Sequence, residues 1–122
     1  MAKIILPMDV VVANANGPAR LVLNHAGRQH HWLGLRLVGG PKTPRDMLGA
    51  RVAVERGDGS ILWRRARSDG SYASANDPRV LVGLGPARAV RRVRVTWPDG
   101  REEEWRDVPV DRWTALREGS GR

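Results

Sequence analysis

The sequence predicts an all-β fold, an antiparallel β-sandwich or barrel-like domain with at most one short helix. Apolar and polar residues alternate with a period of two in several windows; in 31–38, Leu33, Leu35 and Leu37 share one face. Tight-turn signals at Asp58-Gly59 and Asp99-Gly100 separate such windows at the short spacing of hairpins. The 14 glycines and 8 prolines interrupt almost every window long enough for a helix. These observations favour packed antiparallel sheets.

Each strand is predicted from an alternating or continuous apolar run bounded by turn residues. The predicted strands cover residues 9–13, 21–23, 31–38, 50–55, 61–67, 80–84, 93–97, 101–105 and 112–117. Val93, Val95 and Trp97 point to one side of their strand, so we expect Trp97 in the core. The one helix candidate covers residues 86–92 and would have at most two turns.

The composition limits the chemistry that the chain can carry. Its 122 residues suffice for one domain with its own hydrophobic core. It contains no cysteine, which excludes disulfides, thiolate metal sites and a cysteine nucleophile. The net charge of +8 comes almost entirely from arginine, and such a chain attracts nucleic acid, anionic lipid or acidic polysaccharide. However, acidic residues lie between the arginines, and a GC-rich genome would produce the same arginine-rich, lysine-poor composition.

The N-terminus has some features of a signal peptide. Residues 1–15 contain Lys3, a short apolar run and Ala13-Asn14-Ala15, which resembles a cleavage site. Pro7 and Asp9 interrupt the apolar run, so we expect no signal peptide. No apolar run approaches the roughly 20 residues needed to span a bilayer, so we expect no membrane span.

The histidines and serines do not form a recognisable catalytic or metal-binding group. His30 and His31 would face opposite sides of a strand, so they are poorly placed to share a metal with His25. Ser71 and Ser74 lack the context of an activated nucleophile, and no order of serine, histidine and aspartate suggests a triad.

The acidic residues give no better basis for catalysis. Glu102, Glu103 and Glu104 follow a hairpin turn, where we expect them to be solvated rather than paired for acid–base chemistry. The sequence therefore predicts no catalytic residues, no cofactor and no metal. A glycan hydrolase is the function it favours least.

Two polar loops are candidates for ligand binding, because they gather hydroxyl, amide, carboxylate and guanidinium groups next to predicted strands. The candidate residues are Asp46, Arg51, Tyr72, Ser74, Asn76 and Asp77. A structural role is the alternative: Asx turns can explain the second loop, and an arginine–aspartate pair can pin the first. The binding hypothesis requires the two loops to lie side by side.

A second hypothesis is binding of a polyanion or nucleic acid. Trp63 lies among arginines, in the pattern of a stacking surface that also contacts phosphates, although a cation–π contact on a sheet explains it equally well. The residues concerned are Arg64, Arg65, Arg67, Arg91, Arg92 and Arg94. This hypothesis requires the arginines to share one face. With no Phe and one Tyr, a platform of several aromatic residues is not expected, and nucleic acid is the less favoured partner.

Four blocks of the sequence resemble, in order, the ASPIC/UnbV domain. They are HWLGLRLVG at 31–39, RDMLGARV at 45–52, the loop and strand of 70–85, and VRVTWPDG at 93–100. The resemblance covers about residues 30–117. Residues 9–24 resemble the end of a last FG-GAP/VCBS propeller repeat, in which Asp9 would match the final acid of a calcium loop. The earlier acids of that loop are absent, and one carboxylate does not supply the six or more oxygens that calcium takes.

The resemblance implies a propeller remnant at 1–28, an ASPIC/UnbV-like β domain at 29–118 and a frayed tail at 119–122. Residues 26–29 are the polar gap between the first two. It also implies a non-catalytic accessory or interaction domain that binds the propeller repeats of a parent protein or another protein chain, with carbohydrate as a further candidate. Its parent family would be extracellular or periplasmic. We expect this chain to be the C-terminal piece of a longer protein or the product of a truncated gene.

Overall fold

The computed structural model describes residues 9–25, 30–42 and 45–122, and this part of the chain forms nine strands and no helix. The expected boundary at 28/29, its polar gap and residues 1–8 lie outside the described residues. The strands are β1 (Val10–Val12), β2 (Arg20–Val22), β3 (His31–Val38), β4 (Arg51–Arg56), β5 (Ile61–Arg65), β6 (Val80–Gly85), β7 (Val90–Thr96), β8 (Glu102–Trp105) and β9 (Trp113–Arg117).

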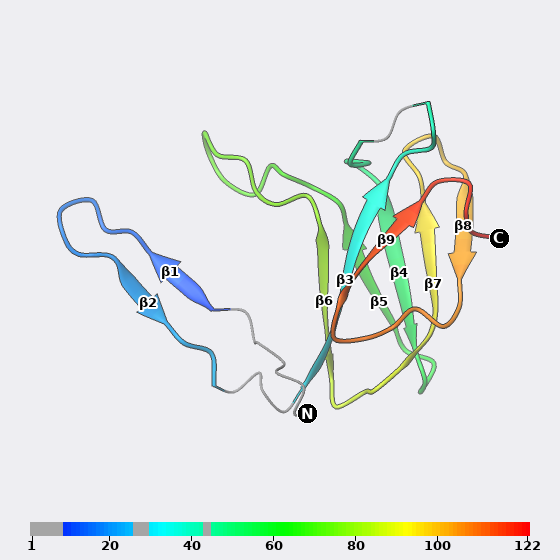
Figure 1. The fold of residues 1–122 in the computed structure, drawn as a ribbon, viewed down its shortest axis with the longest axis horizontal. Helices are drawn as coiled ribbons and strands as arrows, with labels where there is room; N and C mark the ends of the chain where they lie inside the picture. Colours follow the sequence, from blue (N-terminus) through cyan, green and yellow to red (C-terminus); the bar gives the residue numbers. More distant parts are fainter. Residues whose placement is uncertain (1–8, 26–29, 43–44) are drawn as a thin grey trace.

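Two sheets make up the body of the fold (Figure 1), which confirms the predicted all-β sandwich. One sheet has three strands in the order β6-β3-β9, and the other has four in the order β5-β4-β7-β8. The four-stranded sheet is antiparallel throughout, as predicted. The three-stranded sheet is mixed, because β9 lies parallel to β3. Sequence alternation does not report strand direction, so the expectation of a wholly antiparallel fold is corrected here.

The core lies between the two sheets and is built from one face of each central strand. Leu33, Leu35 and Leu37 of β3 are buried, as the period of two predicted. Val52 and Val54 of β4 come from the opposite sheet and are fully buried. Their neighbours in the core are Val80, Val82, Leu84, Val93, Val95, Trp97 and Leu116. The structure thus confirms Trp97 as a core residue.

Both predicted hairpin turns are present. Gly59 and Gly100 have φ values of 87° and 92°, in the region that glycine adopts without strain. The Asp58 carboxylate accepts the Ser60 backbone N–H at 2.9 Å, and the Asp99 carboxylate accepts that of Arg101 at 3.0 Å. These Asx-type bonds explain the aspartate before each glycine.

The helix candidate at 86–92 does not form a helix. Ala87 closes a turn on Leu84, and β7 begins at Val90. Val90 is buried and pairs with Arg56 of β4. A two-turn helix has little stability of its own, so sheet pairing and burial of the valine determine the local structure.

Two expectations for the C-terminal half are also wrong, because Glu103 holds the tail onto β8. Its carboxylate accepts the indole N–H of Trp97 at 2.5 Å and the backbone N–H groups of Gly119 and Gly121 at about 3.0 Å. Glu104 and Arg122 exchange two backbone hydrogen bonds. Glu103 is therefore a structural acceptor rather than a solvated charge, and residues 119–122 are ordered rather than frayed.

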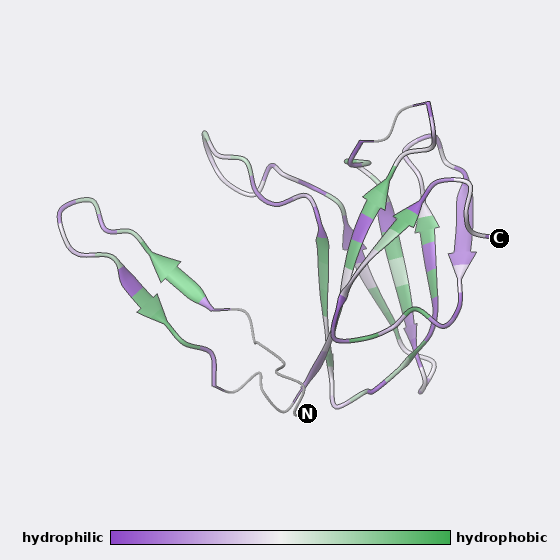
Figure 2. Cartoon of the chain, viewed as in Figure 1, coloured by the Kyte–Doolittle hydropathy of each residue, from purple (hydrophilic) through white to green (hydrophobic). Residues whose placement is uncertain are grey.

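Strands β1 and β2 form a separate two-stranded hairpin, which stands apart from the sandwich in Figure 1. Val11 pairs with Leu21, and both side chains are more than 60% exposed. Val10 and Val22 form the next pair and are each 54% exposed. Because successive residues face opposite sides of a strand, both faces of the hairpin present apolar surface. Figure 2 colours most of β1 and β2 as hydrophobic.

Candidate functional site

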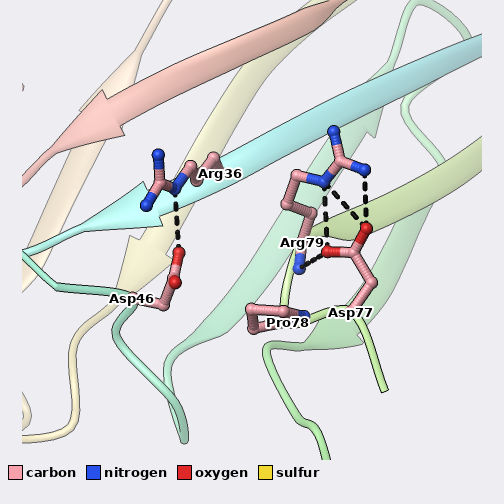
Figure 3. A pocket seen from close by; sticks show the side chains of 5 residues that line it. All are labelled: Arg36, Asp46, Asp77, Pro78 and Arg79. Carbon is pink, nitrogen blue, oxygen red and sulfur yellow. Dashed lines mark hydrogen bonds and ion pairs between the residues drawn. The ribbon is translucent and has the colours of Figure 1, made fainter. Parts of the chain in front are cut away.

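A hollow of about 360 Å³, open to solvent, lies where the loop before β4 meets the loop before β6. Its lining residues, labelled in Figure 3, are Arg36, Asp46, Asp77, Pro78 and Arg79. Asp46 and Asp77, 31 positions apart in the sequence, thus lie in one place, as the loop hypothesis required. We call this set the loop hollow.

Backbone pairing at the end of β3 positions Asp46. Gly39 donates to the Arg45 carbonyl at 2.9 Å, Met47 donates to the Leu37 carbonyl at 3.0 Å, and Asp46 forms a single bridge with Val38. The loop therefore runs back beside β3. On the outer side of β3, the Arg36 Nε donates to the Asp46 carboxylate at 2.9 Å.

Asp77 and Arg79 form the second pair in the loop hollow. The Asp77 carboxylate accepts the backbone N–H of Arg79 at 2.9 Å and three side-chain hydrogen bonds. The Arg79 Nε donates to both carboxylate oxygens, and Nη2 donates to Oδ2 at 2.6 Å. The Arg79 guanidinium also lies 4.0 Å from the ring centre of Trp113, within cation–π range. Arg79 thus connects the loop before β6 to β9 across the outer face of the sheet.

The charges of the loop hollow satisfy one another. The side-chain and backbone hydrogen bonds from Arg79 lower the pKa of Asp77 below its ordinary value of 3.8. The hydrogen bond to Asp77 raises the pKa of Arg79, with a smaller contribution from the Asp46 charge. A general acid at neutral pH needs a raised carboxyl pKa, and Asp77 has the opposite shift. The arrangement is suited to holding two loops together.

The Asp77 pair predicts a small pH-dependent effect on stability. Because the folded state lowers the pKa of Asp77, the pair contributes stability above pH 3.8 and loses it as the pH falls through the lower folded-state pKa. We expect Asp77→Asn to lower the melting temperature at pH 7 and to have less effect near pH 2. Thermal unfolding followed by circular dichroism at both pH values checks this. An equal decrease at both would contradict it.

The other predicted ligand residues lie outside the loop hollow. Arg51 begins β4 on the other sheet, where it pairs in register with Arg65 of β5. Tyr72 is 96% exposed. Ser74 and Asn76 are exposed, and the Asn76 backbone N–H donates to the Ser68 carbonyl at 2.9 Å. Four of the six predicted residues are therefore not part of this site.

Sequence reasoning missed Arg36 and Arg79 as residues of the loop hollow. Arg36 is the exposed residue in an alternating strand, so its outward direction was predictable, but its partner was not. Arg79 follows Asp77 by two positions, a spacing that indicates an Asx turn closed by the side chain. The contact with Trp113 depends on the β3–β9 pairing and had no local signal.

The arginines of the polyanion hypothesis do not share one face, so that form of the hypothesis is wrong. Arg91 and Arg92 both pair with Glu55, and Arg92 also contacts Glu104 at 3.3 Å. Arg67 pairs with Asp69 in the loop after β5 at 3.1 Å. Arg64 is opposite the buried Val52 in register, so it lies on the side of the four-stranded sheet that faces the core. Arg65 and Arg94 lie on the outer side of the same sheet.

His31 has an acidic partner that the sequence did not reveal. Its Nδ1 lies 2.7 Å from Asp111 Oδ2, and Asp111 also accepts the Trp32 backbone N–H at 3.2 Å. Asp111 adopts a positive φ of 59°, and its backbone N–H donates to the Trp32 carbonyl at 2.7 Å. This pair attaches the segment before β9 to the start of β3.

Within the described ranges, no group of three or more His, Asp or Glu residues is arranged to hold a metal ion. The same part of the chain contains no helix long and apolar enough to cross a bilayer.

The two packed sheets, with a loop hollow whose charges are paired internally, define a β-sandwich domain. Residues 40–122 match the family described as ASPIC and UnbV, and the chain belongs to that family. This membership is consistent with an accessory domain and confirms the resemblance seen in the four sequence blocks. No curated protein matches the chain. Strand β3 precedes the matched residues, yet it is the central strand of its sheet, so the folded unit begins before residue 40.

Proposed function

We propose that this chain is a non-catalytic accessory domain that docks through its N-terminal hairpin onto β-propeller repeats of the FG-GAP/VCBS type. The observation that carries the proposal is the hairpin β1–β2, which exposes apolar side chains on both faces. An extracellular or periplasmic location, expected from the resemblance, belongs to the same proposal.

The hairpin has the surface of strands that belong inside a larger β structure. An isolated two-stranded hairpin is marginally stable in water, and both its edges carry unpaired backbone groups. Among the described residues, its stabilising contacts are the β1–β2 pairing and bonds such as Asn24 N–H to the Asp9 carboxylate at 2.9 Å. Strands with apolar residues on both faces are typical of positions covered on both sides. A neighbouring blade would supply both the cover and the edge partner.

The loop hollow supports the non-catalytic part of the proposal. Its two carboxylates are each paired with an arginine, and the pKa of Asp77 is lowered. Paired-carboxylate hydrolysis requires two converging acids whose pKa values are pushed apart, one of them upward. The loop hollow does not offer this arrangement.

Binding to a propeller made without the terminal strands of its last FG-GAP/VCBS repeat tests the docking proposal. We expect a one-to-one complex in sedimentation velocity, with slower amide hydrogen exchange at residues 10–12 and 20–22 on binding. Val11→Lys with Leu21→Lys places two charges on one face of the hairpin and should weaken binding by at least about tenfold.

The matched control is Ile61→Lys, which places a charge at an exposed apolar residue of the sandwich and should leave binding unchanged. All variants should keep the melting temperature of the sandwich. Failure to bind the incomplete propeller would contradict the proposal. Self-association through the hairpin, without propeller binding, would contradict it equally and would assign the surface to a second copy of the chain.

A further inference from the structure

One tryptophan and three arginines lie next to one another on the outer face of the four-stranded sheet. Arg51 of β4 is opposite Arg65 of β5, and Ala53 lies between Trp63 and Arg94 on the neighbouring strands. Residues opposite each other in an antiparallel sheet point to the same side. Because the intervening Val52 faces the core, this set faces outward. We call Arg51, Trp63, Arg65 and Arg94 the arginine–tryptophan face.

These three arginines have few acidic partners, in contrast to the arginines of the described chain that carboxylates hold, although Glu104 of β8 lies opposite Arg94 in register. Arg91, Arg92 and Arg101 are held by carboxylates at the surface. In the described structure, Arg51 and Arg94 have neither a hydrogen bond nor an ion pair from their side chains, and Arg65 has one long contact, 3.7 Å, to Asp69.

The register makes this arrangement costly for folding. Two like charges directly opposite each other on neighbouring strands destabilise a sheet, and Arg51 faces Arg65 in this way. An oxyanion bound between the two guanidinium groups would remove the repulsion. The surface therefore has the charge complementarity of an anion-binding site.

Trp63 adds a flat apolar surface to the charged residues. Its side chain is 57% exposed, while the adjacent Ala53 is buried. Tryptophan combines a large apolar face with a polar edge, which suits ligands that are apolar on one side and polar at the rim. A pyranose ring that presents C–H groups on one face and charged substituents at its edge has this character.

We propose that the arginine–tryptophan face binds an acidic polysaccharide, with a sugar ring on Trp63 and its carboxylate or sulfate groups on Arg51, Arg65 and Arg94. Guanidinium groups bind such planar or tetrahedral oxyanions in a bidentate manner. Single-stranded nucleic acid is disfavoured, because its binders stack successive bases on several aromatic side chains, whereas this face presents one. The proposal does not depend on the hairpin.

Affinity measurements with defined glycans test the proposal on the full chain. The probes are polygalacturonate, which carries carboxylates; heparin, which carries sulfates; neutral dextran; and a single-stranded oligonucleotide. We expect micromolar binding to at least one acidic glycan, no binding to dextran and weaker binding to the oligonucleotide. Binding to polygalacturonate alone would assign carboxylate as the recognised group, and binding to heparin alone would assign sulfate.

Single substitutions distinguish binding at a specific site from nonspecific electrostatic binding to a basic protein. Arg51→Ala or Arg94→Ala should weaken binding by about tenfold and reduce the slope of log K against log salt by about one. Trp63→Ala should weaken binding to a similar extent without changing that slope. Arg112→Ala removes the same charge from an exposed position before β9 and should change affinity less than about twofold.

Three outcomes would overturn the proposal. Equal losses for Arg112→Ala and Arg51→Ala would show diffuse electrostatic binding. Tighter binding of the oligonucleotide than of either acidic glycan, with dependence on Trp63, would identify a nucleic-acid surface instead. Absence of binding to both acidic glycans at low salt, with the melting temperature of the chain unchanged, would show that the face has no such ligand.

Discussion

Trp97→Ala should lower the free energy of unfolding by about 3–5 kcal/mol, the range for removing a large aromatic side chain from a core. Trp97 is 2% exposed and is the largest fully buried side chain among the described residues. Its ring also packs edge-on against Trp105, with ring centres 6.2 Å apart. The substitution additionally removes the indole N–H that the Glu103 carboxylate accepts. The cavity and the lost hydrogen bond both lower the free energy of unfolding.

Urea unfolding followed by circular dichroism measures this effect. Trp63→Ala is the matched control, because it removes the same side chain from a position that is 57% exposed. We expect the control to change stability by less than about 1 kcal/mol, as for most surface substitutions. Similar losses in the two variants would contradict the placement of Trp97 in the core.

Gly34→Ala should destabilise the fold by about 1–3 kcal/mol, because an added Cβ would overlap packed rings. A Cβ at Gly34 would lie 2.5 Å from the Trp113 ring and 2.8 Å from the Trp32 ring. These two rings meet edge to face over Gly34, with centres 5.6 Å apart. Relief of the overlap would require Trp113 to move, and this movement would also disturb its contact with Arg79.

Gly83→Ala, in the neighbouring strand β6, provides the control. A Cβ at Gly83 meets no atom within 4 Å, and the residue is exposed. We expect no loss of stability and a gain of up to about 1 kcal/mol, because alanine reduces the conformational entropy of the unfolded chain. Denaturant unfolding measures the free energies of unfolding of the two variants under the same conditions. Equal stabilities would show that Gly34 is not required by close packing.

Most strands were predictable because each depends on a local pattern. Strand β3 has the predicted bounds, since alternating leucines indicate a half-buried strand from sequence alone. The hairpins at Gly59 and Gly100 were predictable from aspartate–glycine pairs that match the turn geometry. The segment 86–92 was not, because a short run of helix-forming residues gives no information about which strand will pair with it.

The loop hollow was only partly predictable. Asp46 and Asp77 were recognised as polar residues next to strands, and they do line one hollow. Arg51 was included for the same local reason, although β4 places it on the other sheet. Proximity along the chain does not determine which face or which sheet carries a side chain.

The sequence by itself determined the all-β class, the alternation that buries Leu33 and its neighbours, the tight turns and the family, because these depend on periods and motifs a few residues long. Only the tertiary structure decided that β9 runs parallel to β3 and that Glu103 holds the tail. It also decided that Arg51, Arg65 and Arg94 share a face with Trp63. Each of these features depends on the register between strands that are distant in the sequence. The register and the burial of one sheet face determine which side chains become neighbours, and a short stretch of sequence carries no information about either.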